Sequence, residues 1–134
     1  MIVVDSSVWI GQLRGLDRPA VRVLEALREP REIVVGDIVM LEVLRGARDE
    51  SQAARIECEL RRFRLEPMLG LDAAVAAANL YRSLRRSGVT VRKMPDLLIA
   101  AFCVTKDYAL LHDDRDFEQM AGRLNLRIVE TSTP

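Results

Sequence analysis

Four acidic residues, each beside an apolar segment, are the side chains of this sequence that could act together in catalysis: Asp5, Glu42, Asp96 and Asp114. Two carboxylate charges about 4 Å apart repel each other by roughly 4 kcal/mol at an effective dielectric constant near 20. A shared pocket would therefore require that some of them are protonated or that a cation is bound. Because these oxygen ligands have no histidine–cysteine cluster beside them, the cation that fits is Mg²⁺ or Mn²⁺ rather than zinc. An ion held in this way, with positions open to water, suits the hydrolysis of a phosphodiester bond.

Several acids also have a purely structural interpretation. Asp96 follows Pro95 and could cap a helix. Asp37 and Asp72 have the same capping signature and no further sign of function, so we expect them to be structural. The acidic turn 113–116 could be a solvated loop. Spacing alone therefore leaves both the metal site and the structural interpretation open.

The elements that must position these acids can be predicted from the apolar pattern. Short apolar or β-branched segments predict strands at 2–4, 33–35, 109–111 and 127–129, whereas 63–67 is ambiguous and could form a short strand. Helical spacing predicts helices over 8–13, 19–27, 38–44, 51–62, 73–87, 95–104 and from 117 onward. Strands that alternate with helices imply right-handed crossovers and a parallel sheet covered on both faces. We expect an α/β fold, a three-layer α/β/α sandwich with a central parallel sheet of four to five strands, whose loops bring the four acids together.

Length and composition limit the classes of protein to which the chain could belong. Its 134 residues, 49% apolar and 30% charged, fit a single domain over 1–134 and exclude a disordered or fibrous chain. The 20 basic and 20 acidic residues cancel, which excludes coating of nucleic acid through bulk positive charge. Cys58 and Cys103 are too few for a disulfide framework or a zinc site. Since no apolar run approaches the ~20 residues of a membrane span and no basic leader is visible, we expect a cytoplasmic protein without a membrane partner.

Four segments around the acids carry a family resemblance. They are Val-Asp-Ser-Ser-Val-Trp-Ile at 4–10, Met-Leu-Glu-Val-Leu-Arg-Gly at 40–46, Pro-Asp-Leu-Leu-Ile-Ala-Ala at 95–101 and Leu-His-Asp-Asp-Arg-Asp-Phe at 111–117. In the family's order, and over nearly the whole chain, they resemble the PIN domain and, within it, the VapC-type toxins of prokaryotic type II toxin–antitoxin modules. One such motif would be weak evidence, whereas four in register are strong.

The resemblance implies a PIN-like ribonuclease in which Asp5, Glu42, Asp96 and Asp114 are the catalytic residues and the ligands of Mg²⁺ or Mn²⁺. Asp5 and Asp96 would be the firmest ligands, and the other two would complete the shell directly or through water. An activated water would attack the phosphorus of single-stranded RNA and leave 5′-phosphate and 3′-hydroxyl ends. The resemblance also implies a homodimer, and a VapB-type antitoxin that inserts a peptide with a basic side chain near the acidic groove.

Three neighbours of these acids have roles that the sequence leaves open. His112, the one histidine of the chain, stands where the family usually has threonine or serine. It is either structural, a contact to the substrate, or a group that adjusts the charge at the mouth of the site. Asp116 could share or replace the role of Asp114, and of these two residues we favour Asp114. Ser6 could orient Asp5 by donating a hydrogen bond, and capping of the first helix explains it equally well.

Basic residues near the acids are expected to contact the phosphates of the substrate. The candidates are Arg45, Arg92, Lys93 and Arg115. If they bind phosphate, the affinity for RNA falls steeply with salt; a solvated surface is the alternative for each of them. The few aromatic residues give no sign of a base-stacking platform, and Trp9 is expected in the core or at a dimer face.

Two other functions compete with the ribonuclease. A phosphatase of the haloacid dehalogenase type also places an aspartate after its first strand, but it requires a second one two residues later, where this chain has Ser7. A non-catalytic PIN-like module that binds RNA or protein is the second alternative. Loss of the acidic ligands would favour that module, and all four are present. The metal-dependent endoribonuclease is therefore the leading hypothesis.

Overall fold

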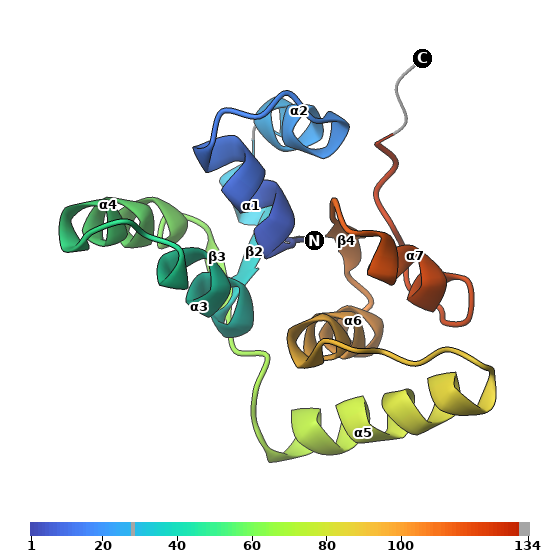
Figure 1. The fold of residues 1–134 in the computed structure, drawn as a ribbon. Coiled ribbons are helices and arrows are strands. Elements are labelled where there is room, and N and C mark those ends of the chain that lie inside the picture. The colour runs from blue at the N-terminus through green and yellow to red at the C-terminus, as the bar shows by residue number, and fades with distance from the viewer. Residues whose placement is uncertain (28, 132–134) are drawn as a thin grey trace.

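Four parallel strands lie at the centre of residues 1–27 and 29–131, the part of the chain that the computed structural model describes (Figure 1). They are β1 (Ile2–Val4), β2 (Ile33–Gly36), β3 (Arg64–Glu66) and β4 (Ala109–Leu111), in the spatial order β3-β2-β1-β4. Because β1 pairs with both β2 and β4, Val3 lies opposite Val34 on one side and Leu110 on the other. All three side chains are buried, as expected for a parallel sheet with both faces covered.

Helices cover both faces of this sheet. They are α1 (Ser6–Leu13), α2 (Pro19–Ala26), α3 (Asp37–Arg45), α4 (Glu50–Leu60), α5 (Leu71–Arg86), α6 (Met94–Lys106) and α7 (Arg115–Ala121), and the short 3-10 turn η1 (Pro30–Glu32) precedes β2. Figure 1 shows α1 and α2 on one side of the sheet and the packed pair α5 and α6 on the other. The predicted three-layer sandwich with a parallel sheet is thus confirmed. Among the described residues, the helices are too short or too polar to cross a membrane.

The two remaining segments considered as strands have different outcomes. The ambiguous segment 63–67 contains β3, which forms one edge of the sheet. The segment 127–129 was expected to form a closing strand, and this prediction is wrong. Leu110 donates to the carbonyl of Arg127 and accepts from the amide of Val129, so the segment makes only one isolated bridge, between Leu110 and Ile128.

Two predicted helix caps are also wrong. Asp37 and Asp72 lie inside the first turns of α3 and α5, whose capping residues are Gly36 and Gly70. Gly70 has φ 144°, a backbone conformation that favours glycine. Asp37 is structural in another way, because its Oδ1 accepts from the backbone N–H of Met68 at 2.7 Å and ties α3 to the segment after β3.

Gly36 makes room for a close contact at the end of β2. A methyl group built on its Cα would overlap the Met68 side chain, which is almost completely buried. Only glycine therefore lets the strand and the methionine pack at this separation.

Trp9 lies in the core. Its side chain is buried, and its ring lies 5.1 Å from that of Phe63 between centroids. The first of the two locations expected for this residue is therefore the one observed.

Candidate metal centre

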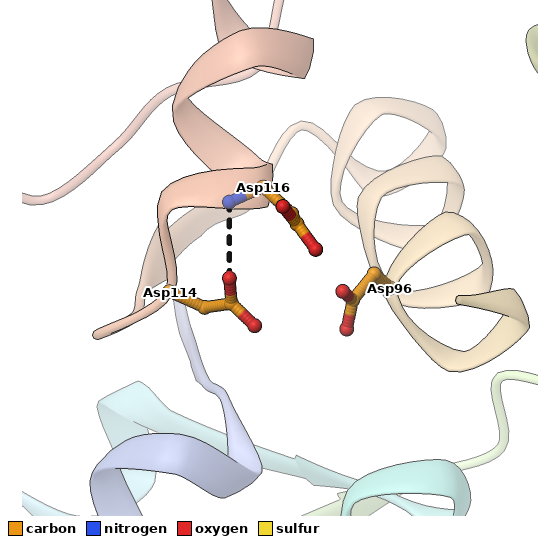
Figure 2. Close-up of side chains that lie close together, drawn as sticks. All are labelled: Asp96, Asp114 and Asp116. Carbon is orange, nitrogen blue, oxygen red and sulfur yellow. Dashed lines mark hydrogen bonds between the residues drawn. The ribbon is translucent and has the colours of Figure 1, made fainter. Parts of the chain in front are cut away.

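Three carboxylates from α6 and the start of α7 face a common space. One oxygen atom from each of Asp96, Asp114 and Asp116 lies within 4.8 Å of the other two. Figure 2 shows Asp96 extending from α6 toward the two residues of the acidic turn. Asp96 is the third residue of α6 and Lys93 is the residue that caps this helix, so the capping interpretation of Asp96 is wrong.

Asp114 is the capping residue of α7. Its Oδ1 accepts from the backbone N–H of Asp116 at 3.0 Å, and its Oδ2 accepts from Lys93 Nζ at 3.2 Å. Burial acts to raise the pKa of Asp114, but these hydrogen bonds outweigh it and leave the pKa below its usual value. Because its pKa is lowered, Asp114 is ionised at neutral pH. As the capping residue it also starts α7 at Arg115, two residues before the predicted position.

Asp96 lies in an environment that disfavours its ionised form. Its residue surface is only 5% exposed, and its Oδ2 is buried with no hydrogen-bond partner among the described residues. Burial, followed by the negative charges of Asp5 and Asp114, raises its pKa from 3.8 to about 7. A buried carboxylate oxygen without a partner is costly, and a cation at this point would satisfy it.

Asp5 lies at the carboxyl end of β1 and is slightly more buried than Asp96, with 3% of its residue surface exposed. Its Oδ2 accepts from the hydroxyl of Ser7 at 2.6 Å and from the Ser7 backbone N–H at 3.1 Å, while its Oδ1 has no partner among the described residues. Burial raises the pKa of Asp5, although the bonds from Ser7 oppose the rise. Asp5 therefore presents a second unsatisfied oxygen beside Asp96.

The orientation of Ser7 is set by the acidic turn. The backbone N–H of Asp113 donates to Ser7 Oγ at 3.1 Å, so the hydroxyl hydrogen of Ser7 is left to donate to Asp5. The Asp113 carboxylate is held in turn by Arg18, whose Nε and Nη2 lie 2.8 and 2.9 Å from its two oxygens. The turn 113–116, which could have been a solvated loop, is therefore tied to α1 and to the segment before α2.

Ser6 has a different partner from the one we expected. Its hydroxyl donates to Oε1 of Glu42 at 3.0 Å, and the side chain that donates to Asp5 is Ser7. Because successive helical residues point in directions about 100° apart, only one of the two serines can face Asp5. The expectation that the Ser6 side chain orients Asp5 is corrected accordingly. Ser6 instead fixes Glu42, which lies half-buried on α3 and whose charge contributes to the raised pKa of Asp96.

The structure brings two of the four acids named from the sequence, Asp96 and Asp114, into one cluster of carboxylate oxygens, and it places Asp5 and Glu42 near this cluster. Asp5, Glu42 and Asp114 all lie close enough to Asp96 for their charges to raise its pKa. Asp116, expected to share or replace the role of Asp114, lies beside both Asp96 and Asp114. A set of carboxylates with unsatisfied buried oxygens and no sulfur or imidazole ligand among them fits a hard divalent cation.

His112 lies behind the acidic turn. Its Nδ1 accepts from the backbone N–H of Asp114 at 3.1 Å, and its ring lies 5.1 Å from that of Phe117. Its Nε2 lies 3.1 Å from an oxygen of Glu118, which places this nitrogen outside the carboxylate cluster. These contacts support the structural alternative for His112.

The predicted phosphate-binding residues fall into two groups. Arg45, Arg92 and Arg115 are exposed, whereas Lys93 pairs with the carboxylates of the cluster. Ser7 and Arg18 were missed as functional residues. The second serine after Asp5 was a usable sign for Ser7, whereas Arg18 lies 95 positions from its partner and no local pattern identifies it.

Comparisons with known proteins agree with this geometry. The PIN domain model matches residues 2–123. The chain is 35% identical, over 132 residues, to the VapC ribonuclease Mb1587 of Mycobacterium bovis and to ribonuclease VapC11 of Mycobacterium tuberculosis, with 95% of this chain and 96% of each relative covered.

Solved structures agree in fold. The structure of VapBC2 from Rickettsia felis bound to a promoter DNA fragment matches with a TM-score of 0.75 at 18% identity and covers 96% of this chain and 98% of that one. VapBC-5 of Mycobacterium tuberculosis matches with a TM-score of 0.65 at 26% identity, covering 95% of both chains. The match over 2–123 and the identity to full-length relatives show that the chain belongs to the PIN-domain family and, within it, to the VapC ribonucleases.

Proposed function

We propose that this protein is an endoribonuclease that hydrolyses RNA phosphodiester bonds with Mg²⁺ or Mn²⁺, and that it is the toxin of a VapBC-type toxin–antitoxin module. The observation that carries the metal dependence is the pair of buried, unsatisfied oxygens of Asp96 and Asp5, which lie among further carboxylates. The names of the relatives, which are VapC ribonucleases, support RNA as the substrate.

In this proposal Asp5, Asp96 and Asp114 hold the ion, and Glu42 and Asp116 complete its shell. A divalent ion held by these carboxylates would supply the activation of water and the stabilisation of the charge that develops at phosphorus. Asp114 is already ionised, whereas Asp96, with a pKa of about 7, must release its proton when it binds the ion. Ser7 keeps one oxygen of Asp5 occupied, so that the other remains available to the ion.

The substrate is held by the exposed arginines in this proposal. Arg45 follows Glu42 on α3, Arg92 precedes the capping residue of α6, and Arg115 begins α7. Their guanidinium groups can contact phosphates in two places. Binding of a single-stranded RNA should therefore weaken as salt rises.

The family context extends the proposal to partners and location. Solved relatives are VapBC complexes of toxin with antitoxin, which supports a VapB-type antitoxin as the partner of this chain. We further propose that residues 1–134 act as one PIN-like domain, that the protein forms a homodimer, and that it works in the cytoplasm.

Cleavage of RNA by the purified protein tests this function. The wild type should cut RNA in Mg²⁺ or Mn²⁺ and stop in EDTA, and Asp5→Asn and Asp96→Asn should abolish cutting while circular dichroism shows an intact fold. Asp72→Asn, at an exposed position in α5, is the matched acidic control and should remain active. Cleavage that continues in EDTA, or in both site variants, would contradict the mechanism. Metal binding without any cleavage would favour the non-catalytic PIN-like module.

A further inference from the structure

Lys93 extends a positive charge into the acidic cluster. Its Nζ lies 3.2 Å from Oδ2 of Asp114 and 3.7 Å from Oδ2 of Asp116. Its side chain is 58% exposed, so the four-carbon stem is free to swing toward solvent. Lys93 caps α6 through its backbone alone, so the position of the ammonium group is set by the carboxylates and not by the helix.

This contact uses an oxygen that a metal ion would need. The Oδ1 of Asp114 accepts from the backbone N–H of Asp116, which leaves Oδ2 as the oxygen free of backbone contacts. Lys93 occupies that same Oδ2. An ammonium group and a divalent ion placed on neighbouring lone pairs repel each other strongly, because like charges at contact distance are unfavourable. Lys93 and a metal ion therefore compete for Asp114.

We propose that Lys93 is a built-in counter-cation of the metal-free cluster, and that a divalent ion displaces it from Asp114 and Asp116 on binding. This inference rests on the proposed function, in that the cluster must bind a divalent ion. Before the ion arrives, the lysine reduces repulsion among three neighbouring carboxylates. Once displaced, its ammonium group stands free beside the site, where the phosphates of the substrate are expected. Metal binding would then release a substrate-binding cation.

The chain carries its own matched control. The lysines of the sequence are Lys93 and Lys106, and they lie at opposite ends of α6. At about 1.5 Å per residue the helix holds them roughly 20 Å apart, about twice the Debye length at 0.1 M salt. Lys106→Met therefore removes the same side chain and the same charge without touching the cluster.

The first test is the affinity for Mn²⁺, measured by electron paramagnetic resonance of the free ion in the full-length protein. Lys93→Met should bind Mn²⁺ about three- to tenfold more tightly than the wild type, because the ion no longer displaces two exposed ion pairs. Lys93→Arg, which can pair with the same oxygens, should stay near the wild-type value, and Lys106→Met should change it by less than about twofold. An unchanged or weaker affinity in folded Lys93→Met overturns the proposal, as does an equal gain in Lys106→Met.

The second test reads the displacement itself. Both lysines are labelled with an acylating reagent, and the extent of labelling at each is followed by mass spectrometry with and without Mg²⁺. Labelling of Lys93 should rise about threefold or more with Mg²⁺, while that of Lys106 stays constant and Asp96→Asn removes the change. If Mn²⁺ binds the wild type but Lys93 labelling does not rise, only the role of Lys93 fails. If the wild type binds no Mn²⁺, the metal site fails and this proposal with it.

Discussion

Replacing Asp96 by asparagine should stabilise the metal-free protein at pH 8 while destroying its function. Burial and the neighbouring charges raise the pKa of Asp96 from 3.8 to about 7. Such a rise corresponds to about 4 kcal/mol in the free energy of ionisation. Solvent screening at the open side of the cluster reduces the effect on stability to about 2 kcal/mol.

The direction of the effect follows from proton linkage. The folded protein holds the Asp96 proton more tightly than the unfolded chain does. This contribution to the free energy of unfolding is therefore complete below pH 3.8 and is lost as the pH rises through about 7. Asparagine does not ionise, so the variant avoids that loss. The advantage of Asp96→Asn should be about 2 kcal/mol at pH 8 and close to zero near pH 4.

Urea unfolding in EDTA at several pH values measures this difference. Asp72→Asn, the exposed control, should change the free energy of unfolding by less than about 0.5 kcal/mol at every pH. Saturating Mn²⁺ should remove the advantage of Asp96→Asn, because only the wild type then gains the binding free energy of the ion. A variant that is no more stable than the wild type at pH 8, or whose advantage does not depend on pH, would refute the reasoning.

Three further predictions concern the residues around the cluster. Ser7→Ala should weaken Mn²⁺ binding by about ten- to a hundredfold, because Asp5 loses a hydrogen bond to its charged form, and Ser7→Thr should restore it; titration calorimetry that finds equal affinities contradicts this role. Arg18→Ala should raise the pKa of Asp113, which the guanidinium group now holds below its usual value, and an NMR titration without such a rise would mean that the pair does not persist in solution. Gly36→Ala should lower the free energy of unfolding by about 1–3 kcal/mol, because the new methyl group overlaps a buried methionine; denaturant unfolding indistinguishable from the wild type would show that the site can relax.

The parts of the fold that local patterns determine could be predicted from the sequence. The strands β1, β2 and β4 are apolar runs followed by polar residues. A parallel sheet covered on both faces buries both sides of each strand, so its strands appear in the sequence as continuous apolar runs. Since ligands gather at the carboxyl ends of such strands, the neighbourhood of Asp5, Glu42, Asp96 and Asp114 also follows from the pattern.

Other features depend on directions and distances that a linear pattern does not contain. Ser6 and Ser7 are adjacent in sequence, and only the rotation of α1 decides that one faces Glu42 and the other Asp5. The inclusion of Asp116 depends on how the acidic turn enters α7. The ion pair of Arg18 joins positions 95 residues apart, so it exists only once the fold has formed.

The most direct measurement of the central claim is the anomalous diffraction of crystals grown with Mn²⁺, combined with RNA cleavage by the same preparation. We expect one or more manganese peaks in contact with Asp96 and Asp114, and cleavage that appears with the ion and disappears in EDTA. Manganese bound elsewhere, or an empty carboxylate cluster in a preparation that still cuts RNA without divalent ions, would contradict the claim that these acids form a metal centre for RNA hydrolysis.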